Sequence, residues 1–328
     1  MRYSDSIYGE VDIEDLVLLD LMAAQAMQRL RGVLQHGITA LIGITQPITR
    51  FDHSVGVMLL VCRLGGRLDE QIAALLHDVS HTAFSHVIDY VVDGHDSQSY
   101  HEEWKEDHLA ASDVPEVLAR HGYDWHDFLL EENYLLLEQP APRLCADRLD
   151  YFLRDSRDLG LSTLDQIRTA LDHLIIFDGR IGVNDLEIAR WLAYTFITAD
   201  KASWANFREV GLYEVTARSI KAAMQIGAIS EDDFWGTDDQ LWRKLHAIDD
   251  AEVQQQLRLV SPATRFEWDE ANPTFHVSTK LRTIDPDVLI GDGFQPLSVL
   301  DDNFARYRAD YLRGNSGKWP MRVIAPDL

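Results

Sequence analysis

Apolar residues recur at intervals of three and four along most of the first 260 positions, the spacing that gives an α-helix one apolar face. Glycines and prolines interrupt this spacing and divide it into segments, as the pair Gly65-Gly66 does. Asp12 can cap the first segment, and Pro142 suits the first turn of a later one. The pattern predicts helices over residues 13–34, 52–64, 68–79, 84–92, 143–159, 185–228 (one or two helices) and 238–259.

The pattern changes after Pro262, where apolar and polar residues alternate in short runs between glycines and prolines. These runs predict short strands over residues 264–268, 275–279 and 322–324. The stretch 93–132 is polar, acidic and rich in histidine, and we expect short helices and loops there. The chain is therefore predicted to be mainly α, with a helical domain over residues 1–261 and a small α+β region over residues 262–328 packed on it.

The 328 residues include 30 lysines and arginines against 54 aspartates and glutamates, a net charge of −24. A surface this acidic repels a phosphate backbone, and we therefore expect no nucleic-acid partner. Wherever the protein binds a phosphate ligand, we expect a local basic pocket or a metal to hold it. No apolar stretch is long enough to cross a bilayer, and the N-terminus has no signal-peptide pattern, so we expect a cytoplasmic protein without membrane contacts. Cys62 and Cys145 could pair, but reduced thiols in the core are the favoured interpretation.

Four residues are candidates for a metal site: His53, His77, Asp78 and Asp147. Each lies on or at the end of a predicted helix. Two imidazoles and two carboxylates form a mixed nitrogen and oxygen set that suits one divalent ion of Fe, Mn, Ni, Co or Zn, with Mg also possible. The alternative for each residue taken singly is an ordinary histidine or aspartate of the core or surface.

The segments around these residues carry a family resemblance. They read Arg50-Phe-Asp-His53-Ser-Val-Gly-Val, Leu75-Leu-His77-Asp78-Val-Ser-His81-Thr-Ala-Phe-Ser-His86 and Asp147-Arg-Leu-Asp-Tyr151-Phe-Leu-Arg-Asp155. With Asp5-Ser-Ile-Tyr-Gly9 and Gln28-Arg-Leu-Arg31 before them, they resemble the ordered motifs of the HD-domain phosphohydrolases, most closely the deoxynucleoside triphosphate triphosphohydrolase branch. The resemblance implies a helical bundle around one catalytic metal held by the four candidate ligands, and a homo-oligomer.

A second group of histidines follows the metal candidates. His77 and His81 are four residues apart and His86 and Asp89 three apart, so each pair shares a face if its segment is helical. A carboxylate beside an imidazole raises its pKa, so His86 backed by Asp89 is the leading proton donor. By resemblance, His81, His86 and His101 line the phosphate site. The alternative for His101 is a solvated residue in an acidic loop.

Candidate substrate contacts lie beside the metal candidates. Arg148, Tyr151 and Asp155 share the predicted helix of Asp147, where an arginine can bind phosphate through two hydrogen bonds. Arg50 lies three residues before the first candidate ligand and is a further phosphate contact.

Two more contacts come from the resemblance: Gln35 matches a glutamine near the sugar, and Lys201 falls where the family often has a phosphate-binding arginine. The alternative for any such basic residue is an ion pair on a helix face. We assign that alternative to Arg154 and Arg157, with Asp155 or its neighbour Asp158 as the partner.

Some positions depart from the family pattern. Ser80 and Thr82 add bulk where the family has a tight turn, so we expect a reshaped phosphate pocket. Ala23 replaces an aspartate of guanine-activated members, so we expect no activation of that kind.

The sequence thus predicts a metal-dependent nucleotide phosphohydrolase that releases triphosphate from a (deoxy)nucleoside triphosphate. Two alternatives stay open. One is an HD phosphomonoesterase or phosphodiesterase that acts on another nucleotide, and the other is a non-catalytic HD scaffold that binds nucleotide.

Overall fold

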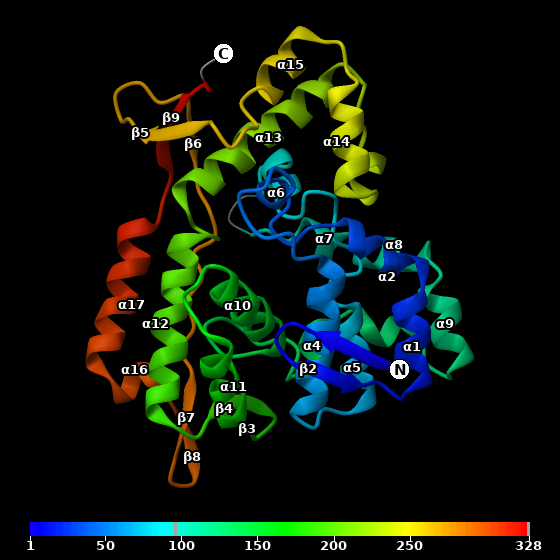
Figure 1. Cartoon of the computed structure of the whole chain (residues 1–328), viewed down its shortest axis with the longest axis vertical. Coiled ribbons are helices and arrows are strands. Elements are labelled where there is room, and N and C mark those ends of the chain that lie inside the picture. Colours follow the sequence, from blue (N-terminus) through cyan, green and yellow to red (C-terminus); the bar gives the residue numbers. More distant parts are fainter. Residues whose placement is uncertain (95–96, 327–328) are drawn as a thin grey trace.

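The structure is a computed structural model that describes residues 1–94 and 97–326. Helices dominate it, as predicted, and three small sheets accompany them (Figure 1). The first elements are β1 (Arg2–Asp5), β2 (Gly9–Asp12), α1 (Leu16–Ala23), α2 (Gln25–Arg29), the 3-10 helix η1 (Leu30–Gly32), α3 (Ile38–Leu41), α4 (Arg50–Arg63), α5 (Leu68–Leu76), α6 (Val87–Val91), α7 (Tyr100–Glu103), α8 (Lys105–Ala110), α9 (Val114–Arg120), η2 (Trp125–Phe128), η3 (Glu131–Asn133) and α10 (Ala146–Asp158). The rest are α11 (Leu164–His173), β3 (Leu174–Phe177), β4 (Arg180–Val183), α12 (Leu186–Ala202), α13 (Phe207–Gln225), η4 (Glu231–Trp235), α14 (Asp238–His246), α15 (Ala251–Leu257), β5 (Arg265–Trp268), β6 (Phe275–Val277), β7 (Asp287–Ile290), β8 (Gly293–Pro296), α16 (Leu297–Leu300), α17 (Asp302–Asn315) and β9 (Trp319–Ile324).

Helix α4 belongs to the larger of two hydrophobic clusters and is buried along most of its length. It packs against both α5 and α10, which carry the other candidate metal ligands on or next to them. Thr49 caps its start, where the hydroxyl accepts a hydrogen bond from the N–H of Asp52. The cap therefore fixes the first turn, which contains His53, and the packing on α5 and α10 fixes the rest of the helix.

Helix α13 is the main element of the second hydrophobic cluster. It packs against α3, α6 and α15, and also against strands of the three-stranded sheet β5-β9-β6. These elements form the upper part of the molecule in Figure 1, above the helices around α4. The loops between the two clusters carry the histidines that follow α5.

The residues after 262 enter two separate sheets. Strands β5, β6 and β9 form an antiparallel sheet of their own, whereas β7 pairs in parallel with β4, with Val288 opposite Val183. The segment 278–286 has no regular secondary structure and connects β6 to β7. We call this segment the strap; in Figure 1 it is the orange trace that descends from the upper sheet to β7. The domain boundary at residue 262 stays a prediction.

Three predicted helices have different bounds. The first is divided because Ala24, with a ψ of 145°, interrupts it between α1 and α2. The helix predicted from Phe84 begins only at α6, because Phe84 and Ser85 have positive φ angles of 61° and 51°. Pro142 precedes α10 rather than starting it, since that helix begins at Ala146.

Other segments show why short elements are hard to predict. The stretch 185–228 forms the two helices α12 and α13, and 238–259 is divided into α14 and α15. The three predicted C-terminal strands are present as β5, β6 and β9. The helices α11 and α17 and the strands β1 to β4, β7 and β8 were not predicted. Each of these strands has four residues, too few for a clear alternation of polar and apolar positions.

Both cysteines are free thiols, in agreement with the favoured interpretation. Cys145 is buried as predicted, but Cys62 is exposed, because it lies in the last turn of α4, where the burial of that helix ends. Within residues 1–94 and 97–326, none of the helices combines the length and apolar character that a bilayer crossing requires.

The packing of α4 on α10 depends on Gly56. A Cβ at this position would lie 1.9 Å from Nη2 of Arg154 and 2.2 Å from Oδ1 of Asp150. We expect Gly56→Ala to lower the free energy of unfolding by about 2 kcal/mol or more, because the buried charged groups must move. Urea unfolding followed by circular dichroism measures this loss. Gly314→Ala in α17 is the control, since its Cβ meets nothing within 4 Å; equal stabilities of the two variants would contradict the prediction.

Candidate metal centre

The four candidate ligands come together between α4, α5 and α10. His53 lies on the first turn of α4, His77 and Asp78 directly follow α5, and Asp147 is on the first turn of α10. Nε2 of His53 is 3.0 Å from Oδ1 of Asp147 and 3.3 Å from Nε2 of His77. The Asp78 carboxylate is 3.6 Å from His77 Nε2 and 3.8 Å from His53 Nε2. His53, His77 and Asp147 thus bring one ligand atom each close enough to share an ion, and the Asp78 carboxylate lies beside this group.

The donor set fits a divalent cation. Nδ1 of His77 is 2.7 Å from the carbonyl oxygen of Ala74, which can only accept, so this nitrogen carries the proton and Nε2 of the neutral ring carries a lone pair. That lone pair faces Nε2 of His53 and the oxygens of Asp147. Ligands bound at right angles to one ion, about 2.1 Å from it, lie about 3 Å apart, close to the separations seen here.

A buried charge network holds His53 from behind. Its Nδ1 is 2.8 Å from Oδ2 of Asp150, which also accepts a hydrogen bond of 2.8 Å from Nε of Arg154. Nη2 of Arg154 donates in turn to Asp5 at 2.9 Å, and the Tyr8 hydroxyl donates to Asp150 at 2.9 Å. These contacts join the β1-β2 hairpin to α4 and α10.

Arg154, one of the two arginines that we assigned to ion pairs on a helix face, does form such a pair, but with Asp150 four residues before it. Arg154 is almost fully buried and pairs with Asp150 and Asp5 rather than with Asp155 or Asp158, because its side of α10 faces α4. Arg157 donates to the carbonyl oxygen of Ser6. The i, i+4 spacing from Asp150 to Arg154 was the available signal, but the sequence does not reveal that the pair is buried.

Three histidine rings form a second cluster beside the metal candidates. The rings of His81 and His101 are stacked, with centroids 3.7 Å apart, and that of His86 is 5.1 Å from His81. Nδ1 of His86 is 3.0 Å from Oδ2 of Asp89, whose other oxygen accepts from the N–H of Tyr100. The region of His81 consists of turns rather than helix, so the helical-face argument for His77 and His81 was wrong.

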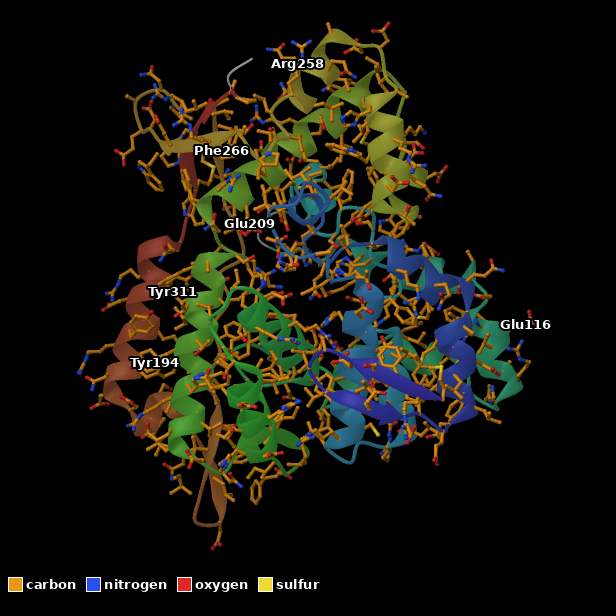
Figure 2. The ribbon with its side chains drawn as sticks, in the orientation of Figure 1. Glu116, Tyr194, Glu209, Arg258, Phe266 and Tyr311 are labelled. Carbon is orange, nitrogen blue, oxygen red and sulfur yellow. The ribbon has the colours of Figure 1, made fainter. Side chains whose placement is uncertain are left out.

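One cavity of about 690 Å³ joins both groups. Glu209, labelled in Figure 2, also lines it from the start of α13. The predicted site residues that line this cavity are Gln35, Arg50, His53, His77, Asp78, His81, His86, His101, Asp147, Arg148 and Tyr151. Ser80 and Thr82 are not among the lining residues, so these two side chains do not shape the cavity wall by direct contact.

Two predicted substrate contacts lie outside the cavity. Asp155 is buried behind His36, bound to its Nε2 at 2.9 Å and to Nε1 of Trp204 at 2.7 Å. Lys201 is exposed, and its ammonium group bonds to the Tyr307 hydroxyl and lies 4.9 Å from the centre of that ring. Neither residue contributes to the cavity wall, because α12 ends beside α17 and His36 covers the carboxylate of α10.

The two arginines that the motifs place beside the metal candidates, Arg50 and Arg148, form ion pairs with carboxylates. Nη1 of Arg50 is 2.8 Å from Oδ2 of Asp78, and its Nε donates to the Ser85 hydroxyl. Arg148 donates to Glu138 at 3.2 Å and to the carbonyl oxygen of Arg143 at 2.7 Å. Their positive charges are therefore balanced by carboxylates before any phosphate binds.

Known proteins share this chain's sequence pattern. The family model for the HD domain matches residues 50–155. The Metal-dependent phosphohydrolase cns2 of Cordyceps militaris is 36% identical over 94% of this chain and 91% of its own length. Uncharacterized protein YdhJ of Bacillus subtilis is 40% identical over 89% of this chain and 90% of its own length. The chain belongs to the HD-domain metal-dependent phosphohydrolases.

More distant similarities concern the fold and one branch of the family. A crystal structure of a hypothetical protein from Aquifex aeolicus superposes on this HD phosphohydrolase with a TM-score of 0.70, at 18% identity, over 99% of this chain and 96% of that one. The Deoxynucleoside triphosphate triphosphohydrolase SAMHD1 homolog of Dictyostelium discoideum is 23% identical over 78% of this chain and 57% of its own length. The fold is therefore shared along the whole chain, whereas the triphosphohydrolase similarity is weaker.

Electrostatics in the HD site favour ionised carboxylates and a charged His77. Burial opposes protonation of His77, but Asp78 and Asp147 outweigh it and raise its pKa to about 10. Burial also opposes ionisation of both carboxyls, yet Arg50 and His77 hold the pKa of Asp78 below its usual range, and His53 and His77 do the same for Asp147. Without a metal, both carboxylates are therefore ionised and the His77 ring is protonated at neutral pH, and a cation that binds Nε2 would displace that proton.

Burial has the opposite effect on the second histidine cluster. It lowers the pKa of His86 even though Asp89 raises it, so the expected net increase is wrong. Burial and the neighbouring His86 also lower the pKa of His101 to about 3. Before substrate binds, these rings are thus mainly neutral.

Several cavity residues of this HD protein had no sequence signal. Lys280, Arg282 and Arg308 line the cavity from the C-terminal region, and Lys105 lines it from α8. No motif includes them, and only the path of the strap brings the first two to the cavity. Arg29 has a supporting role, since it donates to the carbonyl oxygens of Val79 and His81 and so fixes the turn after Asp78.

We expect Asp150→Asn to weaken binding of a divalent metal tenfold to a hundredfold, about the usual effect of losing a partner of a metal-ligating histidine. The amide keeps the volume but no longer supplies a negative charge to His53 and Arg154. Mn²⁺ competition between the protein and a fluorescent chelator measures the affinity. Asp172→Asn, at an exposed carboxylate paired with Arg63, is the matched control. Equal affinities of the two variants would contradict the role of Asp150.

The His36–Asp155 pair predicts a pH dependence of stability. Burial opposes protonation of His36, but Asp155 outweighs it and raises the pKa of His36 from 6.5 to about 9. The folded state thus binds this proton more tightly than the unfolded chain. The stabilisation, at most about 3 kcal/mol, is complete below about pH 6.5 and lost as the pH rises to about 9.

Urea unfolding at pH 6 and pH 9.5 tests this dependence. We expect the loss of unfolding free energy between the two pH values to be smaller in His36→Gln than in the wild-type protein. His126→Gln, at an exposed histidine, should keep the full loss. The same loss in all three proteins would refute the assignment.

Proposed function

We propose that this HD phosphohydrolase acts on nucleotides and releases inorganic triphosphate from a (deoxy)nucleoside triphosphate. The observation that carries the proposal is the single 690 Å³ cavity, which joins the metal candidates, the histidine cluster and a row of cations. Ligand pockets for molecules of nucleotide size fall in the range of about 300–1,000 Å³. The motif resemblance to the triphosphohydrolases supports the same substrate class.

Each part of the cavity has a task in this reaction. His53, His77, Asp78 and Asp147 would hold a divalent metal, which polarises the reacting phosphoryl group and activates the attacking water. Attack at the α-phosphorus breaks its bond to the nucleoside oxygen, which then needs a proton. In its charged form, His86 would give it, because Asp89 accepts from Nδ1–H and leaves the proton on Nε2 free to donate. The negative charge of a bound phosphate chain raises the pKa of this ring and favours its charged form.

A second candidate is a phosphomonoesterase on the same centre. It is favoured by the pairing of Arg50 and Arg148 with carboxylates, and by the positions of Asp155 and Lys201 outside the cavity. Four of the six predicted contacts are therefore not free for a long phosphate chain. A single phosphate at the metal needs fewer cations.

Product analysis distinguishes the two reactions. With Mn²⁺ or Mg²⁺ present, we expect deoxy- or ribonucleoside triphosphates to yield nucleoside and inorganic triphosphate, detected by ion chromatography. Turnover of nucleoside monophosphates alone would establish the phosphomonoesterase instead. Metal binding without turnover of tri-, di- or monophosphates would indicate a non-catalytic scaffold.

Two variants test the roles of the residues. Asp78→Ala should abolish activity together with metal binding. His86→Gln should lower kcat by about 10²- to 10⁴-fold while metal affinity stays unchanged, because only proton transfer is lost. Asp172→Asn again provides the control. A His86→Gln enzyme with wild-type kcat would remove this residue from the proton-transfer step.

A further inference from the structure

The strap has two cationic residues, Lys280 and Arg282, and hydrogen bonds fix it where both line the cavity. The N–H of Arg282 donates to Oδ2 of Asp200 at 2.9 Å, and the Tyr311 hydroxyl donates to the same oxygen at 2.6 Å. Further along, the N–H of Asp285 donates to the carbonyl oxygen of Pro142 at 2.8 Å. Figure 2 labels Tyr311 on α17, the helix that contributes to this anchor. The middle of the strap and its C-terminal end are thereby attached to elements that surround the cavity.

The strap cations differ from the other cavity cations in their partners. Arg50, Lys105 and Arg148 each have a carboxylate oxygen within 3.2 Å. Lys280 and Arg282 have none within 4 Å among residues 1–94 and 97–326. Their hydrogen bonds go to neutral oxygens: Arg282 donates to the carbonyl of Lys280 and to the side-chain oxygen of Gln98, and Lys280 donates to the carbonyl of Ser97.

Cations without a carboxylate within 4 Å are unexpected in a chain that carries 54 acidic residues. Lys280, Arg282 and Arg148 line the same cavity. Burial and the positive charges of the two arginines lower the pKa of Lys280, although the carboxylates of Glu102 and Asp147 act on it in the opposite direction. Like charges that converge on one cavity are stabilised by a polyvalent anion. Arg50 and Arg148, by contrast, are already neutralised by the carboxylates that they contact.

We propose that Lys280 and Arg282 of the strap bind the phosphates of the substrate that do not react, so that the C-terminal region selects for a long phosphate chain. The proposal rests on the proposed function for the identity of the whole substrate. The reacting phosphate belongs at the metal centre, where Arg50 and four ligands already gather. The remaining phosphates need cations elsewhere on the cavity wall, and the strap supplies two that are free of carboxylates.

Inorganic phosphates test the proposal without turnover. Calorimetric titration of the Mn²⁺-loaded full chain with inorganic tripolyphosphate and with orthophosphate, at constant ionic strength, gives the two affinities. We expect the Lys280→Gln, Arg282→Gln double variant to bind tripolyphosphate at least tenfold more weakly, since two charged hydrogen bonds are lost. Its orthophosphate affinity should change less than threefold. Lys318→Gln, an exposed cation of the same region outside the cavity, should change neither.

Unchanged tripolyphosphate binding in the double variant would overturn the proposal, and so would an equal loss for tripolyphosphate and orthophosphate. Lys280→Gln alone serves if the double variant does not fold, because within residues 1–94 and 97–326 the Lys280 side chain makes one hydrogen bond, to the carbonyl oxygen of Ser97. Its tripolyphosphate affinity should still fall severalfold. Nucleotide turnover is measured separately. If the variant no longer distinguishes tripolyphosphate from orthophosphate, the strap's role is supported even when the preferred nucleotide is not a triphosphate. If the variant turns over nucleotides and binds tripolyphosphate as the wild-type protein does, the proposed function stands and the proposed role of the strap is refuted.

Discussion

The position of His53 depends on the carboxylate of Asp150, a fully buried side chain that contacts both the imidazole and Arg154. An isolated carboxylate at this depth would be strongly unfavourable, so the site requires Arg154, and Arg154 requires Asp5 as its second partner. The network has a steric condition as well. Only a glycine at position 56 leaves room for these groups against α4.

This constraint explains why distant motifs belong together. Asp5 also accepts hydrogen bonds from the N–H groups of Ile7 and Tyr8, which closes the turn of the β1-β2 hairpin. The first motif of the chain therefore orients a metal candidate without touching the cavity. Arg29 acts in a similar way from the second motif, through the carbonyl oxygens of the turn after Asp78. Both motifs support the site from outside it.

The sequence predicted the helical class and the residues that gather around the cavity, because motif spacing and apolar periodicity are local properties. It failed where partners come from distant parts of the chain. Asp155 stands at helical spacing from Asp147, but whether it reaches the cavity depends on His36, more than a hundred residues before it. The pKa of His86 likewise depends on burial, which the pattern of its neighbours does not reveal. Lys280 and Arg282 lie in an irregular segment whose path is set by the pairing of β4 with β7.

The strap also bears on how so acidic a protein can hold a phosphate ligand. At long range the net charge of −24 repels an anion, but this repulsion is screened beyond a Debye length of about 8 Å at physiological ionic strength. Inside the cavity, screening is weaker, and the local charges decide. There, Arg50 and Arg148 are balanced by carboxylates, so the net attraction must come from the metal centre and from cations without acidic partners. The acidic surface then discourages nonspecific polyanions, while under the proposal above a small phosphate ester in the cavity would be held by the metal centre and by the two strap cations.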